Sequence, residues 1–199
     1  MATNDITAEE AEACFERGEE MFGDKDYEGA IREYSKAIEL EPDFADVYGY
    51  RGFAYNAKGD YERAIADFTR ALKIDPDDDA FHYWRALSYC NKEDYTAAIK
   101  DFSQAIKING NNYRYYTDRG VAYLNNEKHK LAVSDFTQAI EMSEDDDDVS
   151  SEEWAKLFNA RGMAYCLLDD EKMERADFEQ AVELDPVNSE YRENLEKCS

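Results

Sequence analysis

The sequence predicts an all-α protein built from consecutive pairs of helices. The first observation is compositional: 199 residues contain only three prolines and nine glycines, and alanine, leucine and glutamate are abundant. The second is a small residue that returns every 34 residues, at Gly18, Gly52, Ala86 and Gly120. A period of this length indicates an array of stacked structural repeats.

Five repeats are expected, at about residues 11–44, 45–78, 79–112, 113–146 and 155–188, and places within a repeat are counted from its first residue. The twenty-fourth place is always aromatic: Tyr34, Phe68, Phe102, Phe136 and Phe178. The twenty-seventh place is always alanine: Ala37, Ala71, Ala105, Ala139 and Ala181. Columns this regular indicate that every repeat folds in the same way.

Each repeat is expected to form two helices. In the first helix, the fourth, eighth and eleventh places share one face. Asp26, Asp60 and Asp94 then precede a second apolar run, where their side chains can cap the backbone N–H groups of a new helix. The small eighth place and an alanine at the twentieth place allow the paired helices to approach closely.

The two ends are expected to differ from the repeats. Residues 1–7 are expected to be a flexible N-terminus, after which Thr7 and Glu10 form a capping box. Residues 8–199 then form a single solenoid, which ends in a capping helix at about 189–198 that Ser189 begins. In the fifth repeat, Glu174 stands where alanine is expected, which predicts a looser helix pair.

These repeats resemble the tetratricopeptide repeat family. The resemblance implies antiparallel helix pairs stacked into a right-handed α-solenoid, with the first helices lining a concave groove. One repeat alone cannot bury its apolar face, so stability is expected to come from packing between neighbours.

The charge limits the possible partners. The formal net charge of −24 disfavours nucleic acid, whose phosphates would be repelled. A basic protein or peptide fits this charge, although the charge could also simply keep an extended helical surface soluble. We expect no membrane span and no leader peptide, and the four separated cysteines indicate a reducing, cytoplasmic location.

No arrangement of residues points to catalysis, so we do not expect an enzyme. The two histidines, His82 and His129, occupy a core-facing place and a turn place. No glycine-rich phosphate loop or metalloprotease motif occurs. We expect no cofactor and no bound metal.

A groove for a protein or peptide partner is the stronger hypothesis. The second, fifth, sixth, ninth, twelfth and thirteenth places of each first helix are expected to face this groove. The candidate binding residues among them are Phe15, Phe22, Tyr50, Phe53, Tyr83, Trp84, Leu87, Val121 and Leu124. Aromatic side chains of this kind dominate binding hot spots. Basic residues are almost absent there, so the partner should combine apolar anchors with positive charge. Alternatively, rings such as Phe15 and Phe53 only pack between helices.

Some members of the resembled family are co-chaperones that grip a C-terminal carboxylate with lysine, arginine and asparagine. The matching places here hold Phe15 and Glu19, then Tyr50, then Ala80 and Trp84. A second carboxylate in the groove would repel the first. We therefore expect an interaction scaffold that is not a carboxylate-clamp co-chaperone.

A different hypothesis is a structural protein that assembles with itself through its ends or its groove. A monomer or weak homo-oligomer is expected under the first hypothesis, and larger assemblies under this one.

The acidic insert at about 143–154 adds eight residues between the fourth and fifth repeats. Cation binding and docking of a basic partner are alternatives to a solvated loop. Four consecutive aspartates favour the loop, since calcium sites alternate their ligands with turn residues. Ser143 and Ser150 also precede acidic residues, as an acid-directed kinase requires.

An arginine at the seventh place and an acid sixteen residues later recur in every repeat. The five expected structural ion pairs are Arg17 with Glu33, Arg51 with Asp67, Arg85 with Asp101, Arg119 with Asp135, and Arg161 with Asp177. The arginine stem would cover apolar surface while its guanidinium bonds the carboxylate. The acid could belong to the same repeat or to the preceding one.

Overall fold

The computed structural model describes the backbone of residues 2–143 and 149–198, and the side chains of residues 8–143 and 149–198. Within these ranges the chain forms helices and no strand, which confirms the predicted all-α helical repeat solenoid. The chain divides into two compact units, Met1–Ile108 and Asn109–Ser199. Each unit is described by itself.

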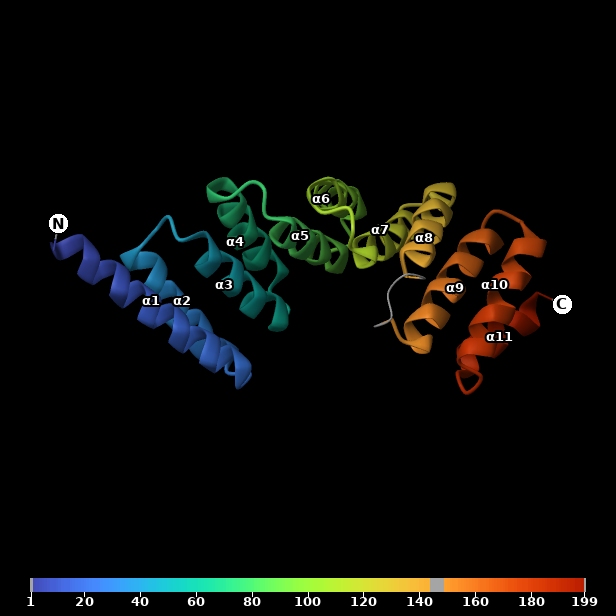
Figure 1. Cartoon of the computed structure of the whole chain (residues 1–199), viewed down its shortest axis with the longest axis horizontal. Coiled ribbons are helices and arrows are strands. Elements are labelled where there is room, and N and C mark those ends of the chain that lie inside the picture. Colours follow the sequence, from blue (N-terminus) through green and yellow to red (C-terminus); the bar gives the residue numbers. More distant parts are fainter. Residues whose placement is uncertain (1, 144–148, 199) are drawn as a thin grey trace. The chain divides into compact units, whose positions relative to one another are not determined.

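The first unit holds three helix pairs, whose members run antiparallel (Figure 1). The helices are α1 (Ala2–Gly23), α2 (Tyr27–Leu40), α3 (Ala45–Ala57), α4 (Tyr61–Ile74), α5 (Asp79–Asn91) and α6 (Tyr95–Ile108). α2 also packs against α3, and α4 against α5, so each pair is joined to the next. The helix pairs correspond to the first three predicted repeats.

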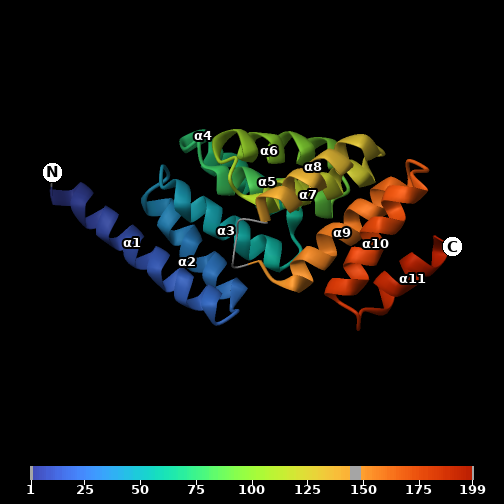
Figure 2. The same cartoon turned by 45° about the vertical axis from the view of Figure 1, so that its right-hand side comes forward.

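The second unit holds two further pairs and a final short helix (Figure 2). The helices are α7 (Tyr113–Asn125), α8 (His129–Ser143), α9 (Ser151–Cys166), α10 (Glu171–Leu184) and α11 (Ser189–Lys197). α8 packs against α9, and α11 against α10. The last helix buries Tyr191 against Ala155 and Ala181, so it covers the end of the fifth repeat.

The second helix of each of the first three pairs follows an aspartate that caps it, as predicted. Asp26, Asp60 and Asp94 accept hydrogen bonds from the backbone N–H groups of Gly29, Arg63 and Ala97. The turn between the two helices of each pair holds one residue with positive φ, which the repeat pattern did not reveal. These residues are Lys25, Gly59, Glu93, Glu127 and Asp169.

The core of each pair is an aromatic ring pressed against the small eighth place of the facing helix. Tyr34, Phe68, Phe102 and Phe136 are fully buried. A Cβ added at Gly18 would lie 2.3 Å from the Tyr34 ring, and one at Gly162 would lie 2.7 Å from Phe178. Glycine is therefore required where the ring approaches most closely. The fifth pair keeps this close approach between Gly162 and Phe178, whereas a hollow of about 230 Å³ lies beside Glu174, where looser packing was expected.

Three helix starts differ from the predictions. α1 begins at Ala2, so Thr7 lies inside it, and the expected flexible residues 2–7 are helical; that segment has no proline or glycine to stop a helix. Asn188, rather than Ser189, caps α11 by accepting from the backbone N–H of Glu190. α9 begins at Ser151, inside the expected insert, because Ser150 and Glu153 form a capping box.

Candidate functional site

The five arginines of the seventh place each bond the acid of their own repeat. The Nε atoms of Arg17, Arg51, Arg85, Arg119 and Arg161 lie 2.6–2.9 Å from a carboxylate oxygen of Glu33, Asp67, Asp101, Asp135 and Asp177, respectively. In the last four pairs, Nη2 donates to the second carboxylate oxygen at 2.8 Å. Since these acids are buried, the guanidinium groups of the five arginines form ion pairs within the fold.

A second contact links the arginine to the preceding repeat. The Nη1 atoms of Arg51, Arg85 and Arg161 donate to the hydroxyls of Ser35, Thr69 and Thr137 at 3.0–3.1 Å. These hydroxyls all occupy the twenty-fifth place, where Ser103 also stands. That column of small hydroxyl residues is the sequence signal for this link. Arg17 belongs to the first repeat described, and its side chain is half exposed.

The first unit contains a hollow of about 490 Å³, which we call the aromatic groove. Its lining residues come from α1, α3, α4 and α5: Phe22, Phe53, Asn56, Ala57, Tyr61, Trp84, Leu87 and Asn91. The Trp84 ring meets the Phe53 ring edge to face at 5.1 Å and is 39% exposed. The groove is thus a mainly apolar surface that solvent can reach.

Four of the predicted binding residues lie in this groove: Phe22, Phe53, Trp84 and Leu87. Phe15 and Tyr50 lie next to it in a chain of ring contacts, since the Tyr50 ring is 5.0 Å from Phe15 and 5.5 Å from Phe53. Phe15, Phe22, Tyr50 and Phe53 are partly buried against the core. These rings therefore both pack between helices and contribute to the exposed surface.

The remaining predicted residues lie elsewhere. The Tyr83 ring packs 5.8 Å from Phe102 of its own helix pair and 5.5 Å from the Trp84 ring. Val121 and Leu124 belong to the second unit; Val121 is 42% exposed, and Leu124 packs against the cluster around Phe136.

The groove also includes polar residues. Asn56 and Asn91 stand at the twelfth and thirteenth places, which were expected to face it, whereas the sequence did not single out Tyr61. Asn56 and Asn91 bring amide groups into the lining, and the buried Ser88 hydroxyl lies 2.9 Å from Asn56 Oδ1, which fixes that amide. Tyr61 enters from the first turn of α4. Tyr27 and Tyr95 occupy the same seventeenth place in their repeats. The sequence therefore shows that tyrosine recurs at this place, but it does not show which surface the ring faces.

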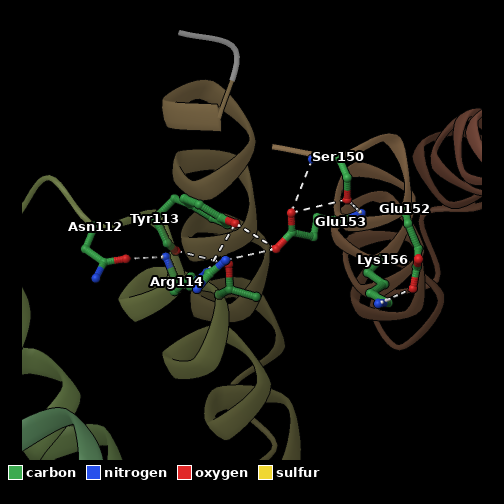
Figure 3. Close-up of polar contacts among 8 residues, drawn as sticks. Asn112, Tyr113, Arg114, Ser150, Glu152, Glu153 and Lys156 are labelled. Carbon is green, nitrogen blue, oxygen red and sulfur yellow. Dashed lines mark hydrogen bonds and ion pairs between the residues drawn. The ribbon is translucent and has the colours of Figure 1, made fainter. Parts of the chain in front are cut away.

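Two basic residues of the second unit, Arg114 and Lys156, are held by glutamates of α9. The Glu153 carboxylate accepts hydrogen bonds from Arg114 Nη2 at 3.1 Å and from the Tyr113 hydroxyl at 3.2 Å (Figure 3). Its other oxygen accepts from the Ser150 backbone N–H, and Lys156 donates to Glu152 at 2.6 Å. Glu153 thus joins the start of α9 to the start of α7.

A smaller hollow of about 230 Å³ lies in the fifth repeat, lined by residues that include Met163, Leu167, Phe178 and Asn194. Glu174 is at its side, where the Cys198 thiol donates to the Glu174 carboxylate at 3.1 Å. Burial, together with this hydrogen bond, raises the pKa of Cys198 to about 12, so the thiol stays protonated. Glu174, which replaces the alanine expected at this place, therefore holds the end of α11 through its hydrogen bond with Cys198.

Only part of the acidic insert is described, since residues 144–148 lie outside the described residues. The alternative that the insert binds a cation falls on those residues. Ser143 is buried, and its hydroxyl donates to the Ala139 carbonyl, so it does not present a modification site. Ser150 is exposed and caps α9. Elsewhere in the described chain, no three acidic, histidine or cysteine side chains gather in a way that would hold a metal ion.

No helix among the described residues has the length and apolar character that a membrane span requires. A comparison with curated protein sequences finds no match.

Solved structures share this fold. A crystal structure of MamA protein is 20% identical with a TM-score of 0.81, covering 92% of this chain and 96% of that one. YrrB, described as a TPR protein with an unusual peptide-binding site, is 20% identical with a TM-score of 0.79, covering 92% and 90%. MamA from Desulfovibrio magneticus RS-1 is 19% identical with a TM-score of 0.81, covering 90% and 97%.

Models of the tetratricopeptide repeat match residues 45–78, 80–112, 113–146 and 155–188. A further TPR repeat model matches residues 12–59. The first four matches follow the predicted repeat boundaries within one residue, and together the five matches span the helix pairs of both units. The chain belongs to the tetratricopeptide repeat family.

Proposed function

We propose that the protein is an interaction scaffold whose aromatic groove binds a partner segment with an apolar anchor and positive charge. The observation that carries this proposal is the hollow of about 490 Å³ beside the exposed Trp84 ring. A volume of this size admits the large apolar side chains of a peptide. Aromatic groups that solvent reaches supply most of the binding free energy in such surfaces.

The charge of the neighbouring residues supports a basic partner. Glu12, Glu16, Glu19 and Asp46 occupy the second, sixth and ninth places of the first two repeats, and all four are exposed. No lysine or arginine occupies those places in the first unit. Charges of one sign around an apolar surface select partners of the opposite sign and speed their association.

The same charges support the proposal that this is not a carboxylate clamp. Glu19 stands where a clamp has asparagine, and Trp84 stands where it has arginine. YrrB has a peptide-binding site that its description calls unusual, and the present chain shares its fold at 20% identity. We therefore favour a peptide partner of this kind over the C-terminal carboxylate of a chaperone.

The test compares Trp84→Ala with a matched control, Leu131→Ala. Leu131 is also an exposed large apolar residue, 48% exposed on α8, and lies outside the groove. Both proteins, immobilised, are offered an array of nine-residue peptides that each carry one tryptophan and several lysines. Trp84→Ala should weaken the tightest binding about tenfold, or 1.4 kcal/mol, with unchanged circular dichroism. Equal binding by both variants and the original protein would contradict the groove.

Self-association is a second candidate, favoured by the exposed apolar surface of the fifth repeat. Leu167 is 55% exposed and Met163 44% exposed, beside the smaller hollow. Light scattering after gel filtration measures the outcome. Dimers or larger species that Leu167→Ser disrupts would support this candidate, and a monomer at micromolar concentration would remove it.

A further inference from the structure

Two asparagines bring amide groups into the mainly apolar lining of the aromatic groove. Asn56 comes from α3 and Asn91 from α5. A peptide that places an apolar side chain in the groove also brings its main-chain N–H and C=O groups against this lining. Those groups lose water on binding, and each one left without a partner weakens the complex. The orientation of the two amides therefore decides what the groove offers to the main chain of a partner.

The amide of Asn56 is held with its oxygen toward the protein. The fully buried Ser88 hydroxyl lies 2.9 Å from Asn56 Oδ1 and 2.9 Å from the Trp84 carbonyl oxygen. That carbonyl lies inside α5, where the backbone N–H four residues later already bonds it, so the hydroxyl proton serves Asn56. Asn56 Nδ2 has no hydrogen-bond partner among the described residues, and it is not a fully buried atom. It is therefore a free donor at the groove.

Asn91 presents the opposite kind of group. Its Nδ2 donates to the Leu87 carbonyl, one turn earlier in α5, at 3.0 Å. The residue is exposed, and its Oδ1 has no hydrogen-bond partner in the described part of the chain. The same bond recurs at the thirteenth place of the fourth repeat, where Asn125 Nδ2 donates to the Val121 carbonyl at 2.9 Å. Asn91 thus presents a free acceptor whose orientation its own helix fixes.

A free donor and a free acceptor suit the main chain of an extended segment. An extended peptide leaves its C=O and N–H groups open to partners, whereas a helix bonds most of them internally. Phe53, Trp84 and Leu87 give the same lining large apolar surfaces for a side chain. An extended segment therefore finds a place for its apolar anchor and partners for its main chain at one surface.

We propose that Asn56 and Asn91 bind the main chain of a partner segment in extended conformation. Asn56 Nδ2 donates to a carbonyl oxygen near the apolar anchor, and Asn91 Oδ1 accepts from a main-chain N–H. Ser88 is a positioning residue, because it acts on the partner only through the Asn56 amide. This inference rests on the proposed function and deepens it, since it makes the occupant of the groove an extended segment rather than a helix.

The test uses a nine-residue peptide with a central tryptophan, four lysines and four alanines, so that its side chains include no amide or hydroxyl group. In a series of analogues, an ester replaces each main-chain amide in turn. An ester removes one N–H and weakens one carbonyl acceptor, and it adds no bulk. Fluorescence anisotropy measures the affinity of every analogue for the full chain, and circular dichroism checks the fold of each variant.

In the original protein, one or two esters near the tryptophan should lower the affinity about fivefold. Asn56→Ala and Asn91→Ala should each weaken the all-amide peptide by a similar factor and reduce one of these ester effects to about twofold or less. Ser88→Ala should weaken binding about threefold, and adding it to Asn56→Ala should cause no further loss. Asn125→Ala is the matched control, since it removes the same kind of amide outside the groove and should change neither quantity.

The outcomes separate this inference from the groove itself. If Trp84→Ala weakens the peptide while both asparagine variants bind it like the original protein, the inference is overturned and the proposed function stands. Ester effects that persist unchanged in both asparagine variants would also overturn it, since the amides would then not bond the main chain. If Ser88→Ala weakens binding further in the Asn56→Ala background, the assignment of Ser88 is wrong. Absence of any Trp84-dependent binding would contradict both proposals.

Discussion

Arg85 and Asp101 form a two-pronged ion pair, in which Nε and Nη2 of the arginine lie 2.6 and 2.8 Å from the two carboxylate oxygens. Both groups are largely buried, with 17% and 6% of their side-chain surfaces exposed. A buried pair of this kind contributes little net stability, but removal of one partner leaves the other charge buried and unpaired. The arginines of the seventh place are thus structural groups.

The first prediction follows directly. Arg85→Ala should lower the free energy of unfolding by about 3 kcal/mol, because Asp101 then stays buried without its partner. Arg114→Ala is the comparison, since Arg114 pairs with Glu153 at an exposed position, with 62% of its side chain exposed. Urea unfolding followed by circular dichroism measures both. Equal losses for the two variants would show that burial does not decide the effect.

A pH dependence should arise from Asp101. Burial opposes its charged form, but hydrogen bonds from Arg85 and His82 outweigh burial and hold the pKa of Asp101 below its ordinary value. The pair's contribution to stability is therefore complete above the unfolded-state pKa, about 3.9, and is lost as the pH falls through the lowered folded-state pKa.

The measurement for Asp101 is urea unfolding at pH 7, 5 and 3. The original protein should lose stability mainly between pH 5 and 3. Asp101→Asn should be less stable at pH 7 and should lose less on acidification, since its side chain does not titrate. If the variant's loss between pH 5 and 3 matches that of the original protein, Asp101 is not the group responsible.

The hydroxyl of Thr69 should strengthen the contact between the second and third repeats. Arg85 Nη1 donates to Thr69 Oγ1 at 3.0 Å. Thr69→Val keeps the shape of the side chain but leaves one guanidinium N–H without its partner, which should cost about 1 kcal/mol. Thr96→Val, at an exposed place on α6, is the control and should change stability by less than about 0.5 kcal/mol. A loss as small for Thr69→Val would mean that water replaces the hydroxyl.

The sequence predicted the repeats well because their signals are local and recur five times. Helix caps such as Asp60 and the ion pair of Arg85 follow from fixed spacings within one repeat. The positive φ of Lys25 and Glu93, 63° and 61°, could not be predicted, because neither residue favours that conformation and the helix-to-helix geometry imposes it. The hydroxyl column of Ser35 and Thr69 was visible, but only the packing of neighbouring repeats shows which arginine it meets.

The candidate site was harder to predict than the fold. Spacing placed Phe53 and Trp84 on one face, yet whether a ring is buried or exposed depends on its side-chain rotamer and its neighbours. The predicted binding residues differ in this respect: Trp84 is exposed, whereas Tyr83 packs on Phe102. Tyr61 enters the groove from the start of α4, a place that periodicity alone assigns to no particular surface.

The close approach of helices in the first repeat gives a last prediction. A Cβ at Gly18 would lie 2.3 Å from Cε1 of Tyr34, whose ring is fully buried and has no room to move. Gly18→Ala should therefore destabilise the protein by about 2 kcal/mol, despite the better helix propensity of alanine. Gly52→Ala should be milder, because its Cβ would lie 3.0 Å from the Phe68 ring and the third repeat already has Ala86 at this place.

Gly23→Ala is the matched control for these two variants. Gly23 is the last residue of α1, and an added Cβ there meets no atom within 4 Å. Because alanine restricts the unfolded chain and favours the helix, this variant should be neutral or slightly more stable. Thermal and urea unfolding of the three variants should thus rank Gly18→Ala lowest, Gly52→Ala between, and Gly23→Ala highest. If Gly18→Ala were as stable as Gly52→Ala, the ring of Tyr34 would have to shift easily, and the close packing of the eighth and twenty-fourth places would not require glycine.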